Sequence, residues 1–278
     1  RLPFSSRLID HRNFLTPISI GSGQTAELYV RIETSGTVEF PLTLYDSALF
    51  SAQDQRISFG VGIYCGLMLV MALYNLALFS AIRRKSYLYY VIFALSFMLF
   101  ETCRTGFAFQ FLWPNWPAWG NVCIVLGVAG AVMGGVFFAI EFIELDKYTR
   151  MPQRMLRAGA VLISVISLSA FGLPYSLVMR AALLLALAMI VTCIALGLMV
   201  WRKGSEFGAI YCVAWIPFLI CAVFNVFRVF GLVSPNVLSE YGMMIGSAAQ
   251  VLILSLALAA QLDNIKRDKL QAERHSLD

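Results

Sequence analysis

No charged side chain occurs between Ile57 and Ile82, and this run constrains the fold more than any other feature of the sequence. A helix rises about 1.5 Å per residue, so the run would be roughly 39 Å long. That length exceeds the hydrocarbon core of a bilayer, which is about 30 Å thick. The whole chain is 59% hydrophobic and 13% charged, whereas soluble domains average about 45–50% and 25%. These features predict an integral membrane protein.

Six further apolar runs follow the first. They span residues 87–109, 119–142, 158–171, 177–201, 207–230 and 238–262. The run 158–171 is the shortest, and a six-helix arrangement is the alternative if it does not cross. Because the other runs are long enough to span a bilayer, we expect an all-α membrane protein with a seven-helix transmembrane bundle over residues 57–262.

Lysine and arginine fall on alternate loops of this arrangement. The basic segments are 83–85, 147–157, 202–203 and 266–274. The segments 110–118, 172–176 and 231–237 contain neither residue. Loops rich in Lys and Arg stay in the cytoplasm, so we expect the N-terminus outside and the C-terminus inside.

Residues 1–50 have a different pattern from the rest of the chain. Three runs rich in β-branched and aromatic residues are separated by glycine and serine, which is typical of antiparallel strands. The runs are Asn13–Ile20, Ala26–Glu33 and Val38–Tyr45. Three strands seldom form a stable domain, so we expect them to complete an extracytoplasmic β-sandwich whose other strands lie upstream in a longer protein. Residues 51–56 are polar and are expected to form a linker.

Groups needed for catalysis or cofactor binding are scarce in the predicted spans. The two histidines, His11 and His275, lie outside them, and no span contains lysine. This pattern argues against a b-type haem, an intramembrane zinc hydrolase and a Ser–His intramembrane protease, and it leaves no lysine for a retinal Schiff base. The six cysteines lie inside spans and are expected to pack there. We therefore expect no enzyme activity, cofactor or metal, and no nucleic-acid partner, because no basic patch is interleaved with aromatic residues.

Polar residues inside spans are the remaining functional candidates, because they are costly in a membrane. Those in the outer half of the bundle are Glu101, Arg104, Arg180, Asn225, Arg228 and Glu240. They either bind a ligand and couple to the outer domain, or are arginines that reach the interface beside one local ion pair. In the first case, Glu101, Arg104, Arg180 and Arg228 would form one cluster whose excess positive charge accepts an anionic group. Asn75 and Gln250 lie deeper and are expected to form interhelical hydrogen bonds.

The tail from residue 263 to residue 278 is predicted to be a cytoplasmic signalling helix. Leu262, Ile265, Leu270 and Leu277 are spaced among charged residues. This spacing is typical of the start of a coiled coil, which predicts a homodimer through the C-terminal helix.

Several short motifs resemble one known family. Before the first span stand Arg7-Leu8-Ile9-Asp10-His11-Arg12-Asn13-Phe14, Leu28-Tyr29-Val30-Arg31-Ile32 and Phe40-Pro41-Leu42. In the spans stand Leu73-Tyr74-Asn75-Leu76, Tyr87-Leu88-Tyr89-Tyr90 and Leu254-Ser255-Leu256-Ala257-Leu258-Ala259. In this order they resemble the bacterial seven-transmembrane receptors with diverse intracellular signalling modules (7TMR-DISM). Gln250 departs from the pattern, in which many members carry Glu.

The resemblance implies a sensor in the bacterial inner membrane. Its outer jelly-roll domain, which in the family resembles carbohydrate-binding modules, would receive a carbohydrate-like ligand. The bundle would pass the stimulus to a cytoplasmic histidine kinase or diguanylate cyclase, in two-component or cyclic-di-GMP signalling. A transporter for a small solute or ion is the alternative, and it would require polar residues near the midplane or discontinuous helices.

Overall fold

The structure is a computed structural model that describes residues 3–31, 42–229, 231–233 and 236–275. Seven helices in this part of the chain are long and apolar enough to cross a membrane. They are α1 (Ser47–Ile82), α2 (Lys85–Arg104), α4 (Pro117–Phe142), α5 (Met151–Leu168), α6 (Tyr175–Arg202), α7 (Glu206–Val229) and α8 (Val237–His275). The short elements are η1 (Phe4–Ser6), α3 (Phe107–Phe111), η2 (Leu145–Lys147) and η3 (Ser169–Phe171). The seven-helix prediction is confirmed.

The first helix begins earlier than the apolar run predicts. Asp46 caps α1, because its carboxylate accepts hydrogen bonds from the backbone N–H groups of Ala48 at 2.9 Å and Leu49 at 3.4 Å. An N-terminal carboxylate also stabilises a helix through the helix dipole. Residues 51–56, predicted to be a linker, are therefore part of α1. The outer segment is joined to the membrane by a continuous helix.

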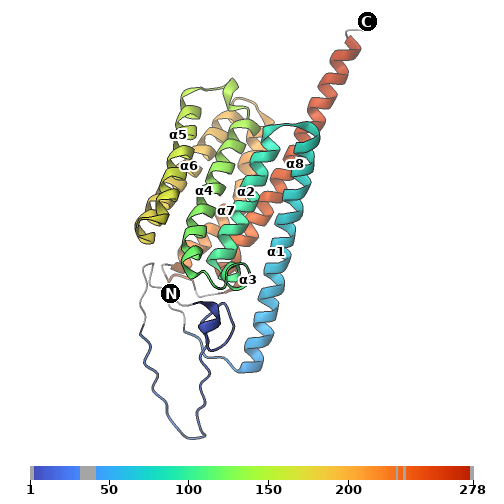
Figure 1. Ribbon diagram of the computed structural model, residues 1–278. Helices are drawn as coiled ribbons and strands as arrows, with labels where there is room; N and C mark the ends of the chain where they lie inside the picture. The colour runs from blue at the N-terminus through green and yellow to red at the C-terminus, as the bar shows by residue number, and fades with distance from the viewer. Residues whose placement is uncertain (1–2, 32–41, 230, 234–235, 276–278) are drawn as a thin grey trace.

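The second helix ends earlier than predicted. It stops at Arg104, and Gly106 has a φ of 82°, in the left-handed region that glycine adopts without strain. The chain then forms the short helix α3, which lies across the outer end of the bundle (Figure 1). The fourth span is longer than expected, because α5 begins at Met151.

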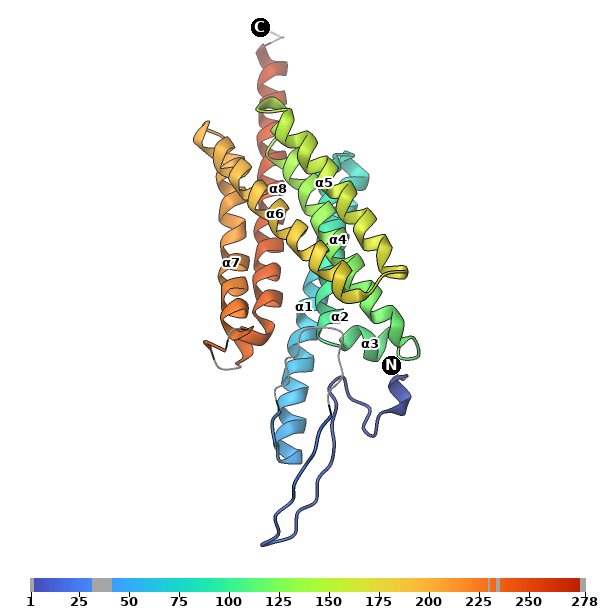
Figure 2. The same cartoon turned by 90° about the vertical axis from the view of Figure 1, so that its left-hand side faces the viewer.

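The helices form one bundle, with the N-terminal segment at one end and the projecting C-terminal helix at the other (Figures 1 and 2). Helix α4 packs against α2, α5 and α6, while α7 pairs with α8, and α1 contacts both α2 and α8. The N-terminal segment and α3 lie at one end, and α8 projects from the other (Figure 1). This arrangement agrees with an N-terminus outside and a C-terminus inside.

The outer segment contains no strand within residues 3–31 and 42–46. The first half of the run Val38–Tyr45 and the end of the run Ala26–Glu33 fall outside the described residues. Large apolar side chains are exposed on the described part, including Phe14, Tyr29 and Leu44. Three strands alone bury too little surface to be stable, so the sandwich remains a prediction that depends on upstream strands.

Glycines on α4 allow α4 to pack closely against α2. A Cβ atom added at Gly134 would lie 2.5 Å from the backbone nitrogen of Phe93 on α2. A Cβ atom added at Gly130 would overlap Ser96 Oγ. Small residues allow the backbones of membrane helices to approach closely. On α1, in contrast, a Cβ added at Gly62 would meet no atom within 4 Å.

Gly134→Ala is therefore expected to lower the free energy of unfolding by about 1–3 kcal/mol, the usual cost of overpacking. The obstacle is the backbone of Phe93, which moves only if α2 and α4 separate. Gly62→Ala is the matched control and should be neutral or slightly stabilising, because alanine favours helix. Unfolding of both variants in detergent measures the difference. Equal stability of the two would contradict this account of the α2–α4 contact.

Candidate functional site

Residues 4–14, here called the outer strap, lie against the outer end of the bundle. Phe4 is buried, its N–H donates to the carbonyl of Pro114 at 2.8 Å, and its ring packs edge-on against Phe109 at 5.5 Å. His11 and Arg12 are also buried, with 6% and 8% of their surface exposed. The strap is therefore packed on the loop and short helix that follow α2.

The carboxylate of Asp54 on α1 binds two side chains of the strap. His11 Nε2 lies 3.0 Å and Arg12 Nη2 lies 2.5 Å from Asp54 Oδ1. The N–H of Asn13 donates to His11 Nδ1 at 3.0 Å, which leaves Nε2 as the nitrogen that donates to Asp54. The Arg12 guanidinium also lies 4.4 Å from the centroid of the Phe107 ring, a cation–π contact with α3. Arg12 thus bridges α1 and α3.

Arg7 holds the strap in this conformation. Its guanidinium donates to the carbonyl of His11 and, at 2.7 Å, to the carbonyl of Arg12. It also lies over the rings of Phe4 and Phe14, at 4.7 and 4.3 Å. Partial burial lowers the pKa of Arg7, but an arginine pKa ordinarily exceeds about 12, so the group stays charged at neutral pH.

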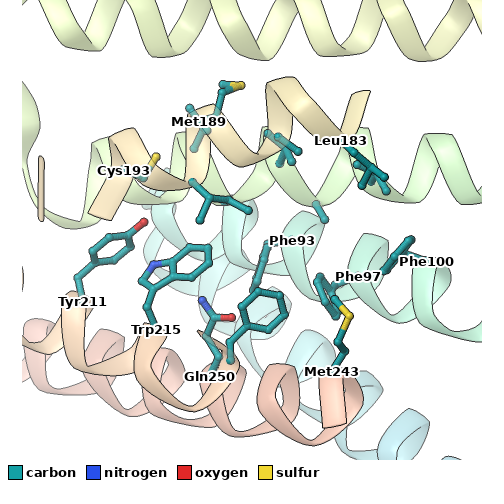
Figure 3. Close-up of a pocket in the computed structure, with 18 residues that line it drawn as sticks. Phe93, Phe97, Phe100, Leu183, Met189, Cys193, Tyr211, Trp215, Met243 and Gln250 are labelled. Atoms are coloured by element: carbon teal, nitrogen blue, oxygen red, sulfur yellow. The ribbon is translucent and has the colours of Figure 1, made fainter. Parts of the chain in front are cut away.

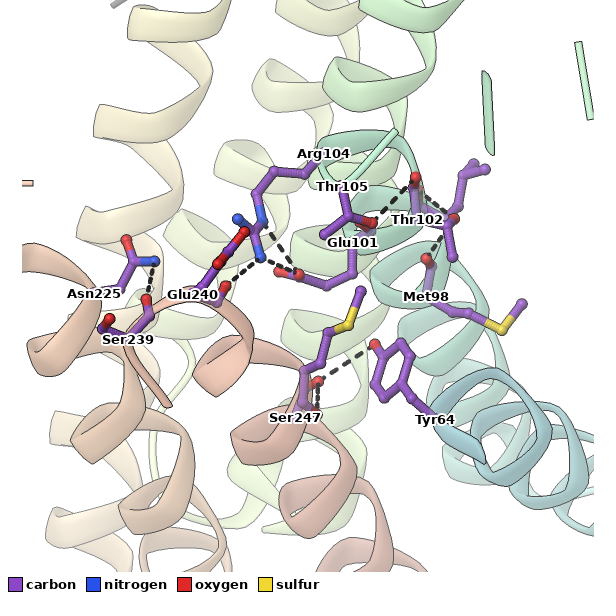
Figure 4. Close-up of polar contacts among 12 residues, drawn as sticks. Tyr64, Met98, Glu101, Thr102, Arg104, Thr105, Asn225, Ser239, Glu240 and Ser247 are labelled. Carbon is purple, nitrogen blue, oxygen red and sulfur yellow. Dashed lines mark hydrogen bonds and ion pairs between the residues drawn. The ribbon is translucent and has the colours of Figure 1, made fainter. Parts of the chain in front are cut away.

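A second polar contact lies deeper, between α2 and α8 (Figure 4). The Glu101 side chain is completely buried, and Arg104 donates to its Oε2 from Nε at 3.1 Å and from Nη2 at 2.7 Å. Arg104 Nη2 also donates to the backbone carbonyl of Glu240 at 3.3 Å. The ion pair therefore connects the outer end of α2 with the first turn of α8.

Hydrogen bonds continue along one face of α8, here called the polar ladder. From the outer end inwards, α8 is joined to α1 and α2 by Tyr64–Ser247 (3.4 Å), Tyr90–Val251 carbonyl (2.8 Å), Asn75–Ser255 (3.0 Å) and Tyr87–Leu258 carbonyl (3.3 Å). At the inner end, Gln261 Nε2 donates to the Phe142 carbonyl of α4 at 3.2 Å. These contacts hold α8 against its neighbours over the depth of the bundle.

The structure brings together only some of the outer-half candidates. Glu101 and Arg104 pair as their three-residue spacing indicates, and Asn225 Nδ2 donates to the Ser239 carbonyl at 3.4 Å. Glu240 contributes its carbonyl to Arg104, while its side chain is exposed.

The predicted cluster of Glu101, Arg104, Arg180 and Arg228 does not form as one group, because Arg180 lies apart from the ion pair. Arg180 is exposed on α6, a helix that packs chiefly against α4, α5 and α7, so it does not join Glu101. Arg228 is half-buried in the last turn of α7. Helical spacing indicates which residues share a face, but not which neighbour that face meets.

Sequence reasoning missed Asp54 and the part played by His11 and Arg12. Both strap residues belong to the motif Arg7–Phe14, which indicated family resemblance only. Asp54 stood in a segment interpreted as a linker. The available signal was a lone acidic side chain just before a long apolar run, with basic residues in the preceding outer segment.

Two family models match the chain. The model described as 7TM diverse intracellular signalling matches residues 58–261, and the model described as 7TMR-DISM extracellular 2 matches residues 1–46. The chain belongs to the 7TMR-DISM family. It is a multi-pass membrane protein of the sensor and signalling-receptor type, with a part of the family's extracellular domain. No curated protein and no solved structure matches it.

The contacts of the outer strap lie at the boundary between the two 7TMR-DISM modules. His11 and Arg12 are in the extracellular match, Phe107 is in the transmembrane match, and Asp54 lies between the two. The strap is therefore the contact between the extracellular module and the 7TMR-DISM bundle within the described residues.

Proposed function

We propose that this chain is the transducing segment of a bacterial inner-membrane receptor. The extracytoplasmic domain binds a stimulus molecule of carbohydrate-like chemistry. The outer strap passes the resulting movement to the bundle, and α8 passes it to a histidine kinase or diguanylate cyclase that follows in the cytoplasm. The segment itself performs no catalysis, and receptors pair through the C-terminal helix.

The observation that carries this proposal is the attachment of His11 and Arg12 to Asp54. Asp54 is on α1, α1 is hydrogen-bonded to α8 through Tyr64 and Asn75, and α8 has 39 residues. A helix of that length extends about 58 Å, well beyond the bilayer. A displacement at the strap thus has a continuous path of bonded, rigid elements to the cytoplasmic side.

A transporter has less support than a receptor. Transporter sites are commonly built from interrupted helices near the midplane. The described residues of the seven spans are continuous helix, and Pro217 lies inside α7 without ending it. The polar ladder fixes α8 against α1 and α2, which suits transmission along the helix.

Double electron–electron resonance on residues 1–278 in nanodiscs tests the proposal. Spin labels at Ser205→Cys and Arg267→Cys, with the native cysteines replaced, report the position of the α8 extension relative to the loop between α6 and α7. Arg12→Gln should shift this distance by about 1–2 Å, the usual size of a signalling helix shift. Leu8→Ala is the control, because Leu8 is exposed on the same strap.

The full-length receptor should respond in parallel. We expect Arg12→Gln to change the basal activity of the output domain several-fold and Leu8→Ala to leave it unchanged. An unshifted distance together with unchanged output in the Arg12 variant would refute coupling through the strap.

A further inference from the structure

The centre of the bundle contains a cavity that the polar ladder and the strap do not use (Figure 3). Its volume is about 140 Å³, and it lies among α2, α4, α6, α7 and α8. Its walls are mainly apolar and include the rings of Phe93, Phe97, Phe218, Tyr211 and Trp215. An engineered protein cavity of about 150 Å³ binds benzene. The space therefore fits one aromatic ring with a small substituent.

Polar groups without ordinary partners line this cavity. Gln250 is 1% exposed, and Figure 3 shows its amide pointing into the space. Gln250 Nε2 has no hydrogen-bond partner among the described residues. The Tyr211 hydroxyl lies near Trp215 and the Cys193 thiol, yet neither this hydroxyl nor Trp215 Nε1 has a partner of normal geometry within the described chain.

Unpaired donors at one site indicate the chemistry of a ligand. Most buried polar groups in proteins are hydrogen-bonded, so three buried polar groups without a hydrogen bond around one cavity call for an explanation. The Gln250 amide, the Trp215 indole and the Tyr211 hydroxyl can all donate hydrogen bonds, and a carbonyl oxygen, with two lone pairs, can accept from two such donors. The described residues that line the cavity include no charged side chain, and burying an ion without a counter-charge is costly. A molecule that fits this cavity would therefore be neutral.

We propose that this cavity is a binding site for a small neutral aromatic molecule that carries a carbonyl oxygen. The ring packs among the phenylalanines, and the carbonyl accepts hydrogen bonds from Gln250 and Trp215. Leu183 of α6 lines the cavity and is 47% exposed at the surface of the bundle. Entry therefore occurs from the membrane, where such molecules partition. This site is separate from the extracytoplasmic domain and stands independently of the signalling proposal.

Acetophenone and ethylbenzene are suitable probes, because they have nearly the same shape and only acetophenone has a carbonyl. Residues 1–278 in nanodiscs are heated, and unfolding is followed by reaction of the buried cysteines with a thiol dye. A ligand that binds only the folded state raises the unfolding temperature in a saturable way. We expect acetophenone to bind roughly a hundredfold more tightly than ethylbenzene, about tenfold for each of its two hydrogen bonds.

Gln250→Leu separates a binding role from a structural one. Acetophenone affinity should fall about tenfold, ethylbenzene affinity should not change, and stability without ligand should be kept or raised, because an unpaired amide is removed. A purely structural glutamine would instead lower the stability on substitution and leave the ratio of the two affinities unaltered.

Variants that reduce the cavity complete the test. Ala186→Leu places a larger side chain in the space and should abolish saturable binding of acetophenone. Gly135→Ala adds only one methyl group to the cavity wall and should weaken acetophenone binding without unfolding the bundle. Its added Cβ would meet Phe93 Cδ2 at 3.5 Å, an ordinary contact. Leu184→Phe, at a strongly exposed position on α6, is the control and should bind normally.

Three results would overturn the proposal. The first is that neither probe stabilises the protein. The second is equal affinity for both probes in the parent chain and in Gln250→Leu, which makes the cavity an apolar packing void. The third is undiminished stabilisation of Ala186→Leu and Gly135→Ala by acetophenone, which places the effect in the lipid.

Discussion

Replacing Arg104 by alanine should destabilise the bundle by about 3–5 kcal/mol, the usual cost of breaking a buried ion pair by removing one partner. The cost is high because Glu101 is fully buried and would keep a carboxylate with no counter-charge. The contact of Arg104 with the Glu240 carbonyl of α8 would be lost as well. Reversible unfolding in mixed detergent micelles measures the change.

The Glu101–Arg104 pair has a matched control in Glu144–Lys147. That pair has the same three-residue spacing, but its lysine side chain is 67% exposed. Lys147→Ala should therefore cost less than about 1 kcal/mol, as exposed ion pairs do. The double variant Glu101→Gln/Arg104→Ala should recover much of the loss, because no buried charge remains. Equal small effects of Arg104→Ala and Lys147→Ala would show that Glu101 does not depend on its partner.

Asp54→Asn should release the outer strap from the bundle. It removes the charge that holds His11 and Arg12, and it leaves the Arg12 side chain, only 4% exposed, without its carboxylate. Asp54 is 23% exposed, so we expect a cost near the lower end for a buried pair, about 3 kcal/mol. That cost corresponds to roughly a hundredfold rise in the population of the detached strap.

Hydrogen exchange measures this release directly. The backbone N–H groups of Phe4 and Asn13 are bonded in the docked strap and should exchange roughly a hundredfold faster in Asp54→Asn. Amides in α4 should be unaffected. Asp10→Asn is the control, because Asp10 is an exposed acid on the same strap. The role assigned to Asp54 fails if strap exchange in Asp54→Asn matches that in Asp10→Asn.

The seven helices and their orientation could be predicted because both depend on local properties. An apolar run such as Ile57–Ile82 must satisfy its own backbone polar groups in lipid, so it forms a helix whatever its neighbours are. The distribution of Lys and Arg among loops is equally local. Helix ends were less predictable, because the start of α1 and the end of α2 depend on Asp46 and Gly106, single residues whose geometry the hydropathy pattern does not contain.

The ion pair of Glu101 and Arg104 could also be anticipated, since residues three apart share a helix face. The partner on α8 could not, because the rotation of each helix in the bundle follows from close packing such as that of Gly134 on Phe93. Arg180 is exposed on α6, which packs chiefly against α4, α5 and α7, and spacing along the chain does not contain that arrangement either.

The sequence by itself determined the spans, their direction across the membrane and the family. Each of these follows from local features of the chain: the apolar runs, the Lys and Arg content of the loops and the short motifs. Only the tertiary structure decided that His11 and Arg12 meet Asp54, more than forty positions along the chain. It also decided that five helices enclose a cavity into which Gln250 points. Contacts between distant segments depend on the path and packing of the whole chain, which local periodicity does not specify.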